Sequence, residues 1–288
     1  MAETTTIEWT DATWNPWTGC TRVNEGCAHC YMERWARRAG REPWTVRRSS
    51  PRTFGLPLRL VPDDRVFVCS LSDFWHADAD AWRADAYAVM RQRLDLTYII
   101  PTKRPERIAG NLPADWGTRG WPNVWLGLSA ATQERLDEGI EPLLAVAAPV
   151  HFLSLEPMVG EIREIYLDPV HVDEIGDGRL PYGDDGEFID GINWVIVGGE
   201  SGGRARPLHP AWVRGIRHKC IAARVPFFFK QWGEWLPAGQ IRTAEQYAAF
   251  ERRRTPHCQW GIHHSARIGR KLAGNVLDGH VWQESPKR

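Results

Sequence analysis

Residues Val150–Met158 read Val-His-Phe-Leu-Ser-Leu-Glu-Pro-Met, a short apolar run that ends in a carboxylate. A continuous apolar stretch of this length is typical of a strand buried on both faces, as the strands of parallel sheets are. A carboxylate at the end of such a strand needs a partner, because an unpaired charge is costly to bury. The segment therefore predicts a parallel strand whose end carries Glu156 into a polar site.

Runs of the same kind recur along the chain, separated by helical patterns at Ala77–Leu94, Ala131–Ala147 and Pro210–Ala223. Strands that alternate with helices indicate βαβ units and a parallel sheet. With a first strand near residues 13–19, we expect a single α/β domain over residues 1–288, a partial or full parallel (β/α) barrel of the TIM type with about seven strands. The other expected strands are Arg65–Ser70, Leu96–Pro101, Asn123–Ser129, Val150–Leu155, Asn193–Gly198 and Pro226–Lys230.

Two segments do not follow this alternation. Residues 168–191 are rich in Asp, Gly and Pro and lack periodicity, which predicts an insertion loop between two strands. Residues from about 236 to 288 follow the last predicted strand and form a C-terminal extension. Within it, Leu277-Asp278-Gly279 predicts a turn.

The composition limits the classes of function. Lys plus Arg number 36, as do Asp plus Glu, so the formal net charge is zero and the whole molecule does not attract nucleic acid, although a local basic face remains compatible. There is no apolar run long enough to span a bilayer and no charged-then-apolar leader, so we expect a cytoplasmic protein without a membrane partner. The 16 tryptophans are interpreted as fillers of the core and its rim, or as aromatic walls for a base or an adenine.

Polar and glycine residues follow the predicted strands. In parallel barrels the active site lies at the C-terminal ends of the strands, with residues drawn from several of them. Six successive strand ends with ionisable or glycine-rich groups therefore favour an enzyme. The candidate residues are Ser70, Ser72, Asp73, His76, Lys103, Arg104, Ser129, Glu156, Gly198, Gly199, Glu200 and Lys230.

The cationic candidates allow two interpretations. Arg104 offers a bidentate fork and Lys103 a point charge, either of which binds a carboxylate or a phosphate. Alternatively the two residues form ion pairs with Asp73 and Glu156 inside the barrel mouth. The same choice applies to Lys230 on the last strand.

Two interpretations also remain for His76 and for the glycine segment after the sixth predicted strand. His76 serves either as a proton donor or polar substrate contact, or as a histidine with its own partners at the rim. Gly198-Gly199-Glu200 either lets the backbone approach a ligand or forms a tight turn in which Ser201 caps the following helix.

The segment Thr18–Tyr31 reads TGCTRVNEGCAHCY and holds three of the six cysteines. Cys20, Cys27 and Cys30 are separated by six and then two residues, with no fourth cysteine nearby. A cubane iron–sulfur cluster held by three thiolates keeps one iron open for a small molecule, whereas a structural zinc ion usually takes four ligands. A zinc site would require a fourth ligand from His29, His257, Cys258 or His263.

Several sequence blocks, in order along nearly the whole chain, resemble phage and prophage three-cysteine-motif proteins. That family is similar to radical S-adenosylmethionine enzymes in its cluster loop and partial barrel. The blocks are IEWTDATWNP from Ile7, the cysteine segment with Tyr31, SLSDFWH, PTKRPER, FLSLEPMVGEI, WVIVGGESG, PFFFKQWG and AGNVLDG.

The resemblance implies a barrel of the radical S-adenosylmethionine type with a [4Fe–4S] cluster on Cys20, Cys27 and Cys30. S-adenosylmethionine would bind the open iron and yield a 5′-deoxyadenosyl radical. The resemblance also implies a bacterial host, an electron donor protein as partner, and a nucleic acid, nucleotide or base as substrate. The catalytic candidates are then Lys103, Arg104, His76 and Lys230, and the cofactor-binding candidates are Ser70, Ser72, Asp73, Ser129, Glu156, Gly198, Gly199 and Glu200.

The sequence departs from the common radical pattern in two respects. The first gap between cysteines is six residues where three is common, and His29 stands where an aromatic residue commonly packs on adenine. Two other functions are therefore kept: a zinc-binding, nucleic-acid-interacting phage protein without redox catalysis, and a metal-dependent hydrolase that uses Asp73, His76 and Glu156. The basic stretch Arg34–Arg48, which contains two tryptophans, is either a solvated face or a grip for a polynucleotide.

Overall fold

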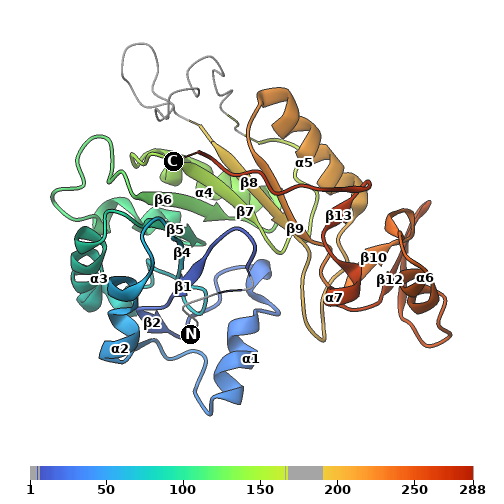
Figure 1. Ribbon diagram of the computed structural model, residues 1–288, viewed down its shortest axis with the longest axis horizontal. Helices are drawn as coiled ribbons and strands as arrows, with labels where there is room; N and C mark the ends of the chain where they lie inside the picture. Colours follow the sequence, from blue (N-terminus) through green and yellow to red (C-terminus); the bar gives the residue numbers. More distant parts are fainter. Residues whose placement is uncertain (1–4, 6, 166, 168–190, 288) are drawn as a thin grey trace.

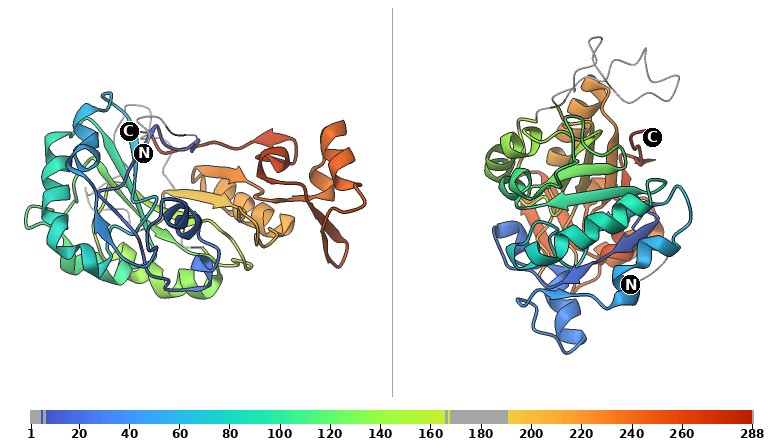
Figure 2. Two further views of the ribbon diagram at one scale, coloured as in Figure 1. Left: turned by 90° about the horizontal axis from the view of Figure 1, so that it is seen from below. Right: turned by 90° about the vertical axis from the view of Figure 1, so that its left-hand side faces the viewer.

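The computed structural model describes residues 5, 7–165, 167 and 191–287. Its centre is a seven-stranded sheet with the order β1-β4-β5-β6-β7-β8-β9, in which every neighbouring pair is parallel. The sheet curls into an open half-barrel, which confirms the expected partial parallel barrel (Figures 1 and 2). The strands are β1 (Ala12–Trp14), β4 (Arg65–Val68), β5 (Thr97–Thr102), β6 (Val124–Ser129), β7 (His151–Leu155), β8 (Trp194–Gly198) and β9 (Phe227–Gln231).

Three helices follow alternate strands, as the sequence predicts. They are α3 (Asp80–Gln92) after β4, α4 (Gln133–Leu144) after β6 and α5 (Pro210–Ala223) after β8. The start of α5 shows why its boundary was predictable: His209 Nδ1 accepts a hydrogen bond from the Ala211 N–H, and Pro210 occupies the first turn. The end of α5 is also determined by the local backbone, because Arg224 takes a left-handed conformation with φ of 55° that stops the helix. After β5 the chain forms only two short 3-10 turns, η4 (Pro105–Arg107) and η5 (Ala109–Asn111).

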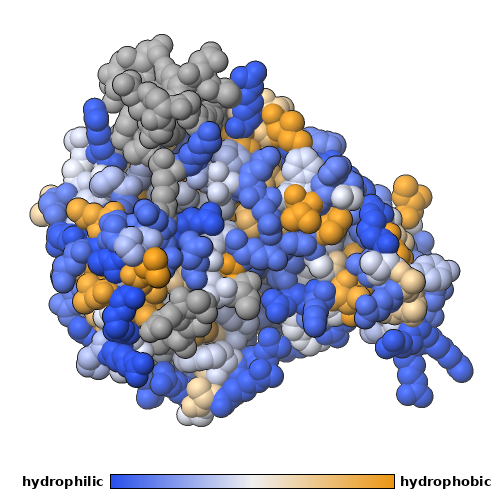
Figure 3. Space-filling model, in the orientation of Figure 1, coloured by the Kyte–Doolittle hydropathy of each residue, from blue (hydrophilic) through white to orange (hydrophobic). Residues whose placement is uncertain are grey.

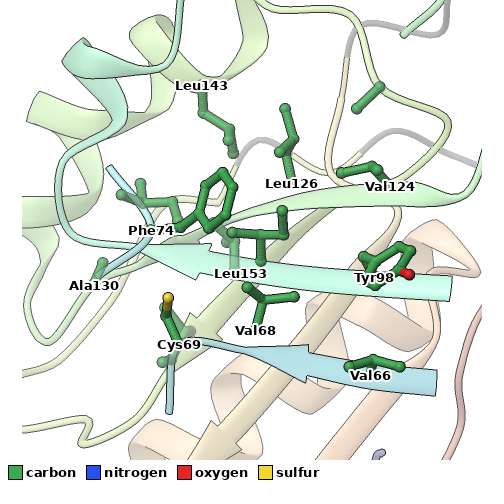
Figure 4. Packing of buried hydrophobic residues seen from close by; sticks show 14 of the residues in the cluster. Val66, Val68, Cys69, Phe74, Tyr98, Val124, Leu126, Ala130, Leu143 and Leu153 are labelled. Carbon is green, nitrogen blue, oxygen red and sulfur yellow. The ribbon is translucent and has the colours of Figure 1, made fainter. Parts of the chain in front are cut away.

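Side chains alternate across the sheet with the period of two that β-strands impose. On β5, Tyr98 and Ile100 belong to the main core cluster, which also includes helix residues such as Met90 of α3 and Leu143 of α4. Figure 4 shows part of this core, with Val66, Val68, Tyr98, Val124, Leu126, Leu143 and Leu153 gathered between the strands and the helices.

The opposite face of the sheet carries a separate aromatic cluster. Trp9, Trp125, Phe152, Trp194 and Phe228 pack together there, each 2% exposed or less. Gly127 on β6 makes room for this packing, because a Cβ atom at that position would lie 2.3 Å from the Phe152 ring. The interpretation of tryptophans as core fillers is thus confirmed for this cluster, which forms an apolar floor inside the half-barrel.

The connection from β1 to β4 holds the cysteine segment. It contains a two-stranded ribbon of β2 (Trp17–Thr18) and β3 (Arg47–Arg48), the 3-10 turn η1 (Glu25–Cys27), α1 (Tyr31–Arg38), α2 (Pro51–Phe54) and η2 (Leu56–Arg59). The single strand expected near residues 13–19 is therefore divided into β1 and β2. Pro16 lies at the break, and proline has no N–H group with which to continue a ladder.

The C-terminal extension lies to one side of the half-barrel (Figure 2). It contains an antiparallel sheet of order β10-β12-β11, the helices α6 and α7, and a hairpin of β13 and β14 whose turn is the predicted Asp278-Gly279. Their bounds are β10 (Trp235–Pro237), η7 (Ala238–Gln240), α6 (Ala244–Phe250), β11 (His257–Trp260), β12 (His263–Arg267), α7 (Arg270–Ala273), β13 (Val276–Leu277) and β14 (His280–Val281).

The predicted insertion loop at 168–191 lies, except for Gly191, outside the described residues. Among the described helices, none has the length and apolar character required to cross a bilayer. Charged and polar residues cover most of the face shown in Figure 3.

Candidate functional site

A cavity of about 590 Å³ lies where the strand ends meet the cysteine segment. This volume is within the range of small-molecule sites. Strand alternation explains which residues line it. The inward-facing positions of β5, β6, β7 and β9 continue to Lys103, Ser129, Glu156 and Lys230, respectively. Of the predicted site residues, all except His76 and Gly198 line it: Cys20, Cys27, Cys30, Ser70, Ser72, Asp73, Lys103, Arg104, Ser129, Glu156, Gly199, Glu200 and Lys230.

The three cysteines of the segment are free thiols with intermediate exposure. Asn24 begins η1 by accepting a hydrogen bond from the Gly26 N–H at 3.0 Å, and Cys27 ends that turn. Cys30 is the residue immediately before α1. The local turn and helix thus present Cys27 and Cys30 to the cavity from one continuous segment.

Two long-range contacts hold this segment against the barrel. The Glu25 carboxylate accepts from Thr132 Oγ1 at 2.8 Å and pairs with Arg135 at 3.3 Å, which connects η1 to the start of α4. On the other side, Arg206 Nη2 donates to the backbone oxygen of Glu25 at 3.1 Å. Arg206 also binds both carboxylate oxygens of Glu200, at 2.8 and 2.9 Å. The cysteine segment is therefore attached to the loops that follow both β6 and β8.

Glu200 is the centre of the second attachment. It is 6% exposed, and its Oε2 lies 3.1 Å from Nδ1 of His29, the residue that stands between Cys27 and Cys30 in the sequence. Burial would raise the pKa of Glu200, but hydrogen bonds from Arg206 and His29 outweigh it, so the pKa lies below its usual value. Glu200 is thus a charged positioning residue whose oxygens are already used within the protein.

Asp73 and Arg104 form a second buried network at the end of β4. The Asp73 carboxylate accepts from Thr102 Oγ1 at 2.8 and 2.9 Å, from the Lys103 N–H at 3.0 Å and from the Trp75 N–H at 2.9 Å. It also lies 3.2 Å from Arg104, whose guanidinium donates to the Sγ atom of Cys20 at 3.6 Å. The predicted ion pair of Arg104 with Asp73 is present, and it directs a positive charge at the first cysteine.

Burial favours the protonated form of Cys20 and Cys30. Burial, with a smaller contribution from the Asp73 charge, raises the pKa of Cys20 to about 11. Burial likewise raises the pKa of Cys30. Both thiols are therefore protonated at neutral pH in the metal-free chain, and a metal that binds them must displace their protons.

Glu156 and Lys230 both line the cavity and form an ion pair there. The Lys230 Nζ atom lies 2.7 and 2.8 Å from the two Glu156 oxygens, and both side chains are 19% exposed. Lys103 does not join this pair, since its Nζ atom donates to Ser129 Oγ at 2.6 Å. The pair has no net charge, but it is partly exposed and forms a polar patch that a polar ligand can contact.

The glycine and serine candidates are fixed by the protein itself. A Cβ atom on Gly199 would lie 2.0 Å from the Trp232 backbone oxygen, so this glycine is required by the close approach of the ends of β8 and β9. The alternative in which Ser201 caps the following helix is wrong, because α5 begins later, at Pro210 after His209. Ser72 Oγ donates to the Gly19 oxygen at 2.5 Å and so also supports the cysteine segment.

His76 lies beside the site but does not line the cavity. Its Nδ1 accepts from the Asp78 N–H at 3.2 Å, and its Nε2 is 3.0 Å from Thr21 Oγ1. Burial and the nearby Arg104 guanidinium lower the pKa of His76. Its environment matches the rim histidine with its own partners.

The cavity also contains residues that were not predicted. Ser154 on β7 lies between Phe152 and Glu156 on the inward face, so strand alternation would have identified it. Trp9 and Arg34 also line the cavity, but they come from segments without strand periodicity. Nothing in the local sequence indicated their place.

The cavity offers sulfur donors to a metal. Three free thiols line one cavity beside the Arg104 cation, a set that suits a thiolate-bound iron–sulfur cluster. The fit is one of donor type and not of geometry: among the described residues, no group of three or more His, Cys, Asp or Glu side chains, these thiols included, is arranged to hold a metal ion. Three residues considered as a fourth zinc ligand, His257, Cys258 and His263, are in the C-terminal sheet and do not line the cavity.

Of the comparisons with known proteins, one identifies a family for this chain. No curated protein and no solved structure matches the chain. One family, described as "Protein of unknown function (DUF5131)", matches residues 4–286, which include both the half-barrel and the C-terminal extension. The chain therefore belongs to the DUF5131 family.

Proposed function

We propose that this protein is a radical S-adenosylmethionine enzyme with a [4Fe–4S] cluster on its three-cysteine segment. One observation carries the proposal: Cys20, Cys27 and Cys30 line the same cavity as the polar strand ends of a parallel half-barrel. A ligand held by the thiols would therefore lie next to the groups that follow β4 to β9. The resemblance to phage three-cysteine-motif proteins supports the same assignment.

In this proposal the three thiolates hold the cluster and leave one iron open for S-adenosylmethionine. When bound, this pair supplies a 5′-deoxyadenosyl radical that can abstract hydrogen from a substrate. Arg104 donates toward Cys20 and would stabilise a thiolate there, an outer contact of the kind that tunes metal ligands. Glu200, through His29 and Arg206, keeps the segment in place.

The Glu156–Lys230 pair and the aromatic residues of the cavity would hold S-adenosylmethionine and shield it from water. Glu156 can accept from the ammonium group or a ribose hydroxyl of S-adenosylmethionine, while Lys230 balances its charge. Trp9 and Phe67 also line the cavity, and their rings would exclude water from that part of it. The proposed substrate is a nucleic acid, nucleotide or base, and an electron donor protein is the proposed partner.

Iron and acid-labile sulfide contents of anaerobically reconstituted protein test the proposal directly. We expect about four of each per chain, and release of 5′-deoxyadenosine after addition of S-adenosylmethionine and dithionite. Cys27→Ala should lose the iron, whereas Cys258→Ala, in the C-terminal sheet, should keep it. One tightly bound zinc ion without deoxyadenosine would contradict the proposal and favour a zinc-binding protein without redox catalysis.

A further inference from the structure

A second cavity of about 490 Å³ adjoins the first and opens beside α1. The two cavities share lining residues, so they are continuous at the cysteine segment: His29, Cys30, Tyr31, Arg34, Ser201 and Gly202. The second cavity is completed by residues of α1 and of the loop after β8: Glu33, Arg37, Arg38, Gly203 and Arg204. We call this second cavity the arginine groove.

The arginine groove has an excess of positive charge. Glu33 is the acid among its lining residues, and that carboxylate already pairs with Arg22 at 2.6 Å and Arg37 at 3.1 Å. Among the residues that the structure describes, no carboxylate forms an ion pair with Arg34, Arg38 or Arg204. These three side chains are exposed and therefore available to an anion.

The walls of the groove are set by packing. Met32 and Ala36 bury one face of α1 against Leu71, which directs the other face outward. Arg34 and Arg38 are four residues apart on α1, so their side chains lie on one side with Cβ atoms about 6 Å apart. The opposite wall is the loop at Gly202, where an added Cβ atom would lie 3.3 Å from the Arg34 guanidinium.

The charge is local, because the whole chain has a formal net charge of zero. Guanidinium groups bind phosphate oxygens in a bidentate manner, and several of them in one groove follow a phosphodiester backbone. Tyr31 lies where the groove meets the first cavity and is 48% exposed, so its ring offers a surface on which a base can stack. A base within a duplex could not reach the first cavity without leaving its stack.

We propose that the arginine groove binds the phosphodiester backbone of a single-stranded nucleic acid and directs one of its bases toward the cysteine segment. The proposal specifies the substrate class for the function proposed above and rests on it for the chemistry. Binding itself requires only the protein surface. It can therefore be measured separately from the cluster.

Fluorescence anisotropy with labelled single strands of about 12 nucleotides, as DNA and as RNA, tests the proposal on the full chain at two salt concentrations. Arg38→Ala and Arg204→Ala should each weaken binding about tenfold, and each should lower the salt dependence by about one ion. Arg253→Ala removes the same charge from an exposed site that follows α6 and lines neither cavity, and should leave Kd within about twofold.

The opposite results are equally clear. The proposal is wrong if neither polymer binds at low salt, if the groove variants bind as the Arg253 variant does, or if polyglutamate competes as well as the single strand. Tighter binding of a duplex of the same length would also contradict it. Iron and sulfide contents of the same variants separate the two proposals, because a chain that binds the cluster but no nucleic acid refutes only the groove.

Discussion

Glu200 and His29 are 171 residues apart in the chain, yet Oε2 of one lies 3.1 Å from Nδ1 of the other. Through this contact the loop after β8 holds the cysteine segment at the edge of the sheet. Because Glu200 also binds Arg206, which reaches the Glu25 backbone, the carboxylate supports the segment at two points.

Removal of this charge should loosen the cysteine segment. Glu200→Gln replaces a buried carboxylate that accepts charged hydrogen bonds, so the free energy of unfolding should fall by about 2 kcal/mol. Amide hydrogen exchange should increase between residues 24 and 30 more than in the helices. Glu161→Gln, at an exposed site, is the matched control and should change neither quantity. Unchanged exchange in the segment would show that Glu200 does not position it.

Asp73 should be a structural residue more than a ligand contact. Its carboxylate accepts from Thr102, Lys103 and Trp75 and pairs with buried Arg104, so Asp73→Asn leaves that guanidinium without its counter-charge. We expect a loss of about 3 kcal/mol in urea unfolding. Asp78→Asn carries the same chemical change at an exposed side chain and should cost less than about 0.5 kcal/mol. Equal stabilities of the two variants would refute the structural role.

Gly199, directly after β8, tests the two interpretations of the Gly198-Gly199-Glu200 motif, which are ligand approach and close packing of the backbone. Gly199→Ala would place a methyl group 2.0 Å from the Trp232 backbone oxygen, which cannot move without shifting the end of β9. We expect about 3 kcal/mol of destabilisation or more, measured by thermal or urea unfolding without any ligand. Gly203→Ala meets no atom within 4 Å and is the control. A stable Gly199→Ala protein would indicate that the glycine serves ligand approach alone.

Local sequence was sufficient for most of the fold. The apolar runs at β7 and β8, and the capping and breaking signals of α5, depend on neighbours in the chain, so their places were predictable. The strand expected near residues 13–19 was too long because the pattern of apolar residues outweighed Pro16. The C-terminal sheet was not predicted, since its strands are short and lack the continuous apolar runs of the half-barrel strands.

The site was predictable only in part. Strand ends converge in any parallel barrel, which explains why the sequence pattern alone indicates Glu156 and Lys230, which form an ion pair in the structure. Which carboxylates are already paired depends on contacts between distant segments. Arg206, for example, stands in a stretch of glycine and arginine that has the composition of a solvated loop, yet it binds Glu200 and the Glu25 backbone.

The last prediction concerns the C-terminal extension and its pH dependence. Asp278, in the hairpin turn, accepts hydrogen bonds from Arg214 at 2.7 Å, Gln240 at 2.8 Å and Arg217 at 2.8 Å. The bond from Arg214 is the largest of the causes that hold the pKa of Asp278 far below its usual value. The folded state therefore favours the charged form, and this stabilisation is complete above the unfolded pKa of about 3.9.

As pH falls from about 5 through the unfolded pKa, that contribution should be lost progressively. Asp278→Asn keeps a residue that tolerates the left-handed turn, where φ is 52°, but removes the charge. The variant should be less stable by about 2 kcal/mol at pH 7, and its unfolding free energy should decline less steeply than that of the wild type between pH 5 and 3. Asp137→Asn, on the exposed side of α4, should follow the wild-type profile. If the Asp278→Asn and wild-type profiles ran parallel, the hydrogen bonds from Arg214 and Arg217 would not depend on the carboxylate charge, and another contact would have to hold the extension to α5.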